Sequence, residues 1–134
     1  MQVKNDVIDV KLGGFGLCHF DYVRHSSGRV GTPPFLAPEV IVNEHKYDEK
    51  ADIWALGIVF YILFTGTNLF LHKTTTELFN KIVNSHILFN RNLMNHQDFL
   101  DFIHKIFNRN PKQRPSARHL LNHPWIIKNV PLEY

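Results

Sequence analysis

The alternation of apolar and polar residues predicts one short strand and five helices. Apolar residues at positions 7, 8, 10 and 12 predict a strand near the N-terminus, which Gly13 and Gly14 would end. Residues 17–36 are rich in turn-forming residues and predict an irregular loop. Apolar positions at helical spacing then predict a mainly α-helical unit with minimal β structure at its start, with helices at about 37–43, 48–66, 74–85, 97–107 and 116–121.

The helix expected at 48–66 has an unusual composition. Twelve consecutive residues, Ile53 to Phe64, contain no polar break. This run is too short to cross a bilayer, which takes about 20 apolar residues. A helix that is apolar on every face must be surrounded by protein. We therefore expect a buried central helix and no membrane partner.

Composition and charge narrow the function only slightly. The 134 residues are 44% hydrophobic, which is enough for a core, and the formal charge is +3. The densest basic segment, residues 108–118, would suit a nucleic-acid patch. We expect instead a solvated turn with one arginine turned inward, and no nucleic-acid partner. The single cysteine, Cys18, fits a reducing compartment and predicts an intracellular, cytoplasmic protein.

Two patterns raise the question of ligand binding. Gly14 and Gly16 are spaced as in a phosphate-binding loop, but the dinucleotide fingerprint needs a third glycine where His19 stands. His119 and His123 have the i, i+4 spacing that suits zinc on a helix, but no third ligand is evident nearby. Spacing therefore argues against both a phosphate cradle and a metal site.

Four segments occur in an order that resembles the C-terminal lobe of eukaryotic protein kinases. They are VKLGGFGL, GTPPFLAPEVI, YDEKADIWALGIVFYILFTG and NPKQRPSARHLLNHPWI. The resemblance covers nearly the whole chain and is closest to the calcium/calmodulin-dependent serine/threonine kinases. It implies a partial kinase C-lobe, made of a strand and degenerate metal loop (1–16), an activation segment (17–39), a helical subdomain (40–127) and a tail (128–134).

The resemblance explains the glycine-rich stretch. The family motif K-[LI]-x-D-F-G supplies the aspartate that holds Mg²⁺ on ATP. Phe15 and Gly16 match this motif, but Gly14 stands at the aspartate position and offers no carboxylate. The family's H-R-D-L-x-x-x-N catalytic loop is not found in the thirteen residues before Gly14, and the glycine-rich ATP loop and β3 lysine are also absent. The resemblance thus implies no catalytic residue, cofactor or metal for this chain, although the family uses ATP and Mg²⁺.

Three further residues match structural positions of the family. Glu39 closes the A-P-E segment, and in the family this glutamate pairs with a buried arginine that corresponds to Arg114. Asp52 matches the residue that opens the buried helix and hydrogen-bonds the backbone of the catalytic loop. We expect all three to be structural rather than catalytic.

The activation segment contains the remaining candidates. Thr32 matches a threonine that helps position a serine or threonine substrate, with a simple turn hydroxyl as the alternative. Ser26 and Ser27 lie where activating phosphorylation often occurs, although the commonest position corresponds to Gly28.

These observations leave three functions open. The leading one is a truncated serine/threonine-kinase-like domain that is inactive as an isolated chain. The second is a pseudokinase-type adaptor that binds proteins through the helix expected at 74–85. The third is a split enzyme completed by a partner chain, against which Gly14 counts. In the family, the helix matching 53–64 packs on helices that precede the catalytic loop. We therefore also expect exposed apolar surface that promotes oligomerisation or aggregation.

Overall fold

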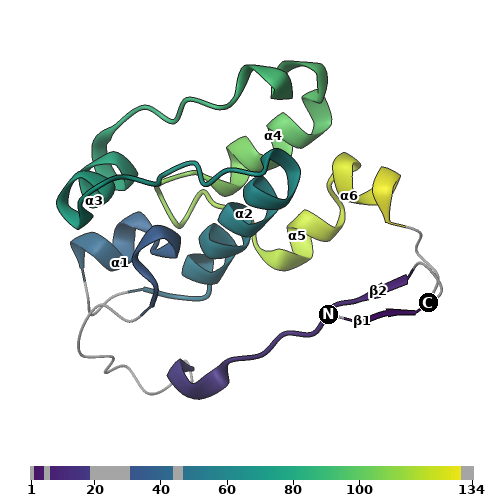
Figure 1. The fold of residues 1–134 in the computed structure, drawn as a ribbon, viewed down its shortest axis with the longest axis horizontal. Helices are drawn as coiled ribbons and strands as arrows, with labels where there is room; N and C mark the ends of the chain where they lie inside the picture. The colour runs from purple at the N-terminus through teal and green to yellow at the C-terminus, as the bar shows by residue number, and fades with distance from the viewer. Residues whose placement is uncertain (1, 5–6, 19–30, 44–46, 131–134) are drawn as a thin grey trace.

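The computed structural model of the chain describes residues 2–4, 7–18, 31–43 and 47–130 (Figure 1). Its first element is an antiparallel hairpin of β1 (Gln2–Lys4) and β2 (Val7–Asp9), with Val3 opposite Ile8. The sequence predicted one strand up to Leu12. The structure shows two shorter strands, followed by the exposed residues 10–18 with the 3₁₀ turn η1 (Phe15–Leu17). Figure 1 shows this segment running along one side of the helices.

The rest of the described chain is helical, which confirms the prediction of a mainly α-helical unit. A 3₁₀ turn, η2 (Pro33–Phe35), leads into the first helix, and another, η3 (Arg91–Asn95), precedes α4. The helices are α1 (Pro38–Val42), α2 (Lys50–Thr65), α3 (Thr75–Asn84), α4 (Gln97–Ile106), α5 (Ala117–Leu121) and α6 (Pro124–Asn129).

The sequence predicts a helix that stops before Pro124 and none after it, whereas the structure shows the additional helix α6. Proline has no backbone N–H to lose at the first position of a helix, so it starts α6 instead of only ending α5. The ring of His123 accepts the backbone N–H of Trp125 and caps the new helix. Capping side chains also begin two predicted helices, since Thr74 and Ser116 accept backbone N–H groups of α3 and α5.

Helix α2 lies in the middle of the helical unit (Figure 1) and packs closely against α4. Its inward face buries Trp54, Ile58 and Tyr61. Gly57 permits the close approach, because a Cβ atom there would collide with Ile106. The indole of Trp54 meets two phenylalanine rings, with centroids 5.0 and 5.6 Å away.

The expectation that α2 is buried on every face is wrong. Its outer face leaves Leu56, Val59 and Leu63 exposed, whereas only the inward face is covered. This is the exposed apolar surface that the sequence predicted on other grounds. Within the described ranges, no helix is long and apolar enough to cross a membrane.

Candidate functional site

A buried network of hydrogen bonds joins the start of α1 to the loop before α5. Arg114 Nη1 donates to Glu39 Oε1 at 2.7 Å, and Nη2 donates to Oε2 at 2.9 Å. Glu39 stands in the first turn of α1, directly after Pro38. Arg114 is 1% exposed and the Glu39 side chain 10%. The guanidinium fork therefore holds the carboxylate by two parallel hydrogen bonds inside the protein, as the sequence predicted for this pair.

The remaining donors of Arg114 tie the pair to other elements. Nη1 also donates to the carbonyl of Lys50 at 2.5 Å, at the start of α2, and Nε donates to the carbonyl of Asn108 at 3.1 Å. The guanidinium carbon lies 5.2 Å from the centroid of the Trp54 ring, within cation–π range. In return, Lys50 Nζ donates to the carbonyl of Arg114 at 2.8 Å. This anchor, defined as Glu39 with Arg114 and its partners, connects three segments of the chain.

Gly14 lies in an exposed turn far along the chain from this anchor. Its backbone is left-handed, with φ of 82° and ψ of 34°, and it precedes η1. A Cβ atom built on Gly14 would have nothing within 4 Å, so the turn leaves room for a side chain. The part of the chain that the structure describes contains no group of three or more histidine, cysteine, aspartate or glutamate side chains arranged to hold a metal. Gly14 itself therefore contributes no side-chain oxygen to a metal ion at this turn.

The other predicted site residues are dispersed. Asp52 is exposed in the first turn of α2 and makes no side-chain hydrogen bond or ion pair within the described residues. Thr32 is also exposed, and its hydroxyl does not cap η2, although its carbonyl accepts the N–H of Phe35 at 2.9 Å. Ser26 and Ser27 lie outside the described residues. Among those described, only Glu39 and Arg114 are brought together, and the roles assigned to the others stay predictions.

The basic segment 108–118 turns two arginines inward rather than one. Besides Arg114, Arg109 donates to the carbonyls of Lys81, Ile82 and Ser85, with 2.7 Å between its Nε and the Ile82 oxygen. Partial burial lowers the pKa of Arg109. These carbonyls end α3, so Arg109 fastens that helix to the loop. Sequence reasoning missed this contact because no local pattern connects residues so far apart in the chain.

The two histidines with zinc-like spacing face different partners. His119 Nδ1 lies 2.9 Å from the hydroxyl of Ser116. His123 is buried, and its Nε2 lies 3.0 Å from Asp101 Oδ2 on α4. Lys105 donates to the same oxygen at 2.6 Å and, more than His123, lowers the pKa of Asp101. His123 therefore joins α6 to α4 rather than forming a pair of ligands with His119.

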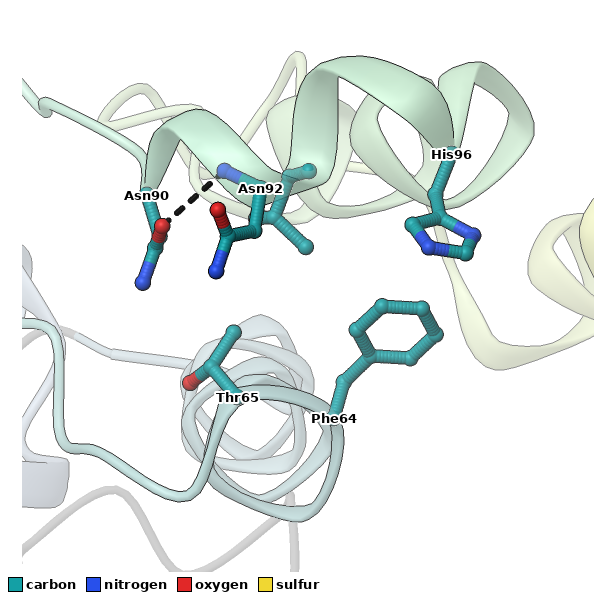
Figure 2. Close-up of a pocket in the computed structure, with 6 residues that line it drawn as sticks. Phe64, Thr65, Asn90, Asn92 and His96 are labelled. Carbon is teal, nitrogen blue, oxygen red and sulfur yellow. Dashed lines mark hydrogen bonds between the residues drawn. The ribbon is translucent and has the colours of Figure 1, made fainter.

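A shallow hollow of about 190 Å³ lies between the end of α2 and η3. Figure 2 shows the rings of Phe64 and His96 facing one another at its rim, and their centroids are 5.0 Å apart. Asn90 accepts the backbone N–H of Asn92 at 3.0 Å on the opposite side. None of the residues predicted as functional from the sequence lines this hollow, and its own polar groups are mostly exposed.

Comparison with known proteins matches this chain to protein kinases. Residues 1–126 match the family model described as the protein kinase domain. The chain is 32% identical over 124 residues to a probable cell cycle serine/threonine-protein kinase, the CDC5 homolog of Encephalitozoon cuniculi. It is 37% identical over 111 residues to calcium-dependent protein kinase 17 of Arabidopsis thaliana, and 37% over 132 residues to serine/threonine-protein kinase dst1 of Dictyostelium discoideum. These alignments cover 90%, 78% and 96% of this chain but only 26%, 21% and 18% of the relatives.

Proposed function

Since the chain belongs to the protein kinase domain family, we propose that it is a serine/threonine-kinase-like C-lobe that does not itself transfer phosphate. The observation that carries this proposal is Gly14, which stands where the family motif has its metal-binding aspartate. Phosphoryl transfer depends on positioning and on neutralising the charge of the phosphates, which the metal ions largely supply. A glycine contributes no oxygen to that task.

The structure supports this proposal because the residues that stabilise the helical unit differ from those at the metal-loop position. The anchor of Glu39 and Arg114 is complete and buried, so the helical unit has the contacts that hold it together. The turn at Gly14 is exposed, and residues 10–18 contain no aspartate or glutamate. A chain built this way keeps the shape of the lobe without binding the magnesium complex of ATP.

The proposal is tested by measuring transfer of radiolabelled phosphate from ATP to a serine-containing peptide and by titrating the chain with Mg²⁺ and ATP in a calorimeter. We expect no transfer above a no-enzyme control and no binding heat. Gly14→Asp restores the carboxylate, and Gly14→Ala imposes the same left-handed strain without it. We expect both variants to be inactive, because the sequence contains no H-R-D motif to supply a base. Phosphate transfer by the wild type would refute the proposal. Transfer by Gly14→Asp alone would support the role of Gly14 and refute the expectation that the missing H-R-D motif keeps the variant inactive.

The alternative role as a protein-binding adaptor is favoured by the way α3 is held. Arg109 fixes the C-terminal end of α3, whose buried residues Leu78 and Ile82 face the core. Its outer surface, which includes Asn80, is exposed. A photo-crosslinker placed at Asn80 should capture a protein partner, whereas one at the exposed Asn122, which directly follows α5, should not. Equal capture from both positions would contradict docking on α3.

The proposed location is the cytoplasm. Cys18 is the single cysteine of the chain and is exposed and free in the structure. An exposed free thiol is compatible with a reducing compartment and supports this proposal.

A further inference from the structure

A buried histidine connects the last helix of the described chain to α4. His123 is 7% exposed and directly precedes α6. Its Nδ1 accepts the backbone N–H of Trp125 at 3.2 Å, and its Nε2 lies 3.0 Å from Asp101 Oδ2. Both nitrogens of the ring therefore have partners, the first within α6 and the second on α4.

These two contacts determine where the ring carries its hydrogen. A ring nitrogen that accepts an N–H group has no hydrogen of its own, so Nδ1 is unprotonated. In a neutral imidazole the other nitrogen then bears the hydrogen, and Nε2 donates to the carboxylate of Asp101. The docking of α6 in this arrangement thus requires the neutral form of His123.

Helix α6 contributes an aromatic side chain whose packing depends on this docking. The ring of Trp125 packs among three phenylalanine rings of α2 and α4, with centroid distances of 5.6 Å to Phe60, 5.0 Å to Phe99 and 4.8 Å to Phe102. Trp125 is the second residue of α6, and its own N–H is the group that His123 caps. The cap and the aromatic packing therefore act on the same helical turn.

The charges nearest to His123 do not offset the loss of this cap. Asp101 would attract a second proton on the ring, but Lys105 Nζ already binds the same carboxylate oxygen at 2.6 Å and lies 3.4 Å from Nε2. Coulomb energies scale with inverse distance, so the attraction over 3.0 Å and the repulsion over 3.4 Å nearly cancel. A cationic ring in this buried position would also lose most of its hydration.

The remaining charged groups nearby leave this balance unchanged. Helix α2 contains no charged residue from 53 to 65. Among the described residues, the other charged or titratable side chains of α4, α5 and α6 lie at the surface and form no hydrogen bond or ion pair with His123. They are Asp98, His104, Arg118, His119 and Lys128.

We propose that His123, with Asp101 and Trp125, forms a proton-sensitive latch that holds α6 on α4. A second proton on the ring would occupy Nδ1, so that two N–H groups would point at one another and the N–H of Trp125 would lose its acceptor. The ring would still donate to Asp101 from Nε2. The first turn of α6 would lose its cap, and Trp125 would loosen from its aromatic neighbours.

The latch operates in the range where histidines change charge, between about pH 5 and 8. Lys105 lowers the pKa of Asp101, so that carboxylate stays ionised throughout this range. The proton is taken up as the pH falls, so docking is complete on the alkaline side and weakens on the acid side. We therefore expect α6 to be docked at the upper end of the range and loosened at the lower end.

Acrylamide quenching of tryptophan fluorescence at about pH 8 and pH 5 tests the latch. Trp54 is 0% exposed, so a change in quenching within the folded chain reports on Trp125. The quenching constant should rise roughly twofold at the lower pH, since loss of a cap shifts a local opening equilibrium several-fold. His123→Asn should show no such rise, because asparagine caps a helix with an oxygen that does not titrate.

His86→Asn is the matched control, because His86 is exposed and lies between α3 and η3. This variant should respond to pH like the wild type. A wild type without the rise would overturn the proposal, as would a rise that persists in His123→Asn. Loss of the near-ultraviolet circular dichroism of wild type and His123→Asn alike at the lower pH would show unfolding of the whole chain, which also contradicts a latch.

Nitrogen-15 NMR of the imidazole rings gives a second measurement on the unmodified chain. At the upper end of the pH range, His123 should have its hydrogen on Nε2 and none on Nδ1. A hydrogen on Nδ1 under these conditions would overturn the proposal, whatever the behaviour of the variants. Neither measurement involves ATP, so failure of the latch is distinct from failure of the proposal about phosphate transfer.

Discussion

Replacing Arg114 by alanine should destabilise the chain more than any nearby surface substitution. The change removes both hydrogen bonds to Glu39 and leaves that carboxylate, only 10% exposed, without its counter-charge. Breaking a buried ion pair from one side costs about 3–5 kcal/mol. The carbonyls of Lys50 and Asn108 also lose a donor. The estimate lies at the upper end of that range because these losses all act on buried groups.

The assay is reversible urea unfolding followed by circular dichroism, with Lys112→Ala as the control. Lys112 is exposed two residues away, so its truncation should change the free energy of unfolding by no more than about 0.5 kcal/mol. Arg114→Lys should recover part of the loss but not all of it, because an ammonium cannot reproduce the two parallel hydrogen bonds. Glu39→Gln keeps the shape of the side chain and removes its charge. Its effect therefore measures how much the charge of Glu39 contributes to the free energy of unfolding.

A double-mutant cycle separates the pair from its surroundings. If the contact is as the structure has it, Arg114→Ala and Glu39→Ala together should cost clearly less than the sum of the two single changes. The reasoning is refuted if Arg114→Ala costs less than about 1 kcal/mol, the value typical of an exposed pair. Strict additivity in the cycle would contradict it equally.

Two further predictions concern packing and pH. Gly57→Ala should lower the free energy of unfolding by about 1–3 kcal/mol, because its Cβ would overlap Ile106, whereas Gly13→Ala meets no atom within 4 Å and should have little effect on the melting temperature. The pKa of Asp101 is lowered by Lys105, so the carboxylate stabilises the fold above the unfolded pKa of about 3.9, and this contribution should be lost as the pH falls through the lower folded value. Asp101→Asn should flatten the acid limb of a stability-against-pH curve, and an unchanged limb would contradict the assignment.

The sequence predicted the helical segments well because their apolar spacing is strong and local. The sequence indicates Ser116 as a cap, and α5 begins directly after it, whereas α3 is capped by Thr74 and not by Thr75 or Thr76, the two candidates that the sequence favours. The pairing of Glu39 with Arg114, which are separated by 75 positions, came from the family resemblance and not from any local pattern. Resemblance brings long-range information that spacing rules lack.

The misses have a common physical cause. Two contacts were missed: Arg109 binds the end of α3, and His123 contacts Asp101. Each joins residues more than 20 positions apart. Such contacts depend on how helices are placed, which periodicity does not determine. The exposed face of α2 was not predicted for a related reason. An all-apolar sequence favours burial of every face of a helix, but a face is buried only where a neighbouring element covers it.

The backbone at Gly14 favours glycine, and no packing in the described structure depends on a side chain there. The backbone there is left-handed, which costs a residue with a side chain free energy that glycine does not pay. Nothing packs against the position, so no buried contact depends on a carboxylate. Restoring aspartate should therefore leave stability unchanged or slightly lower it, whereas removing Arg114 should be costly. The stability of the helical unit and the chemistry expected of its family thus rest on different residues.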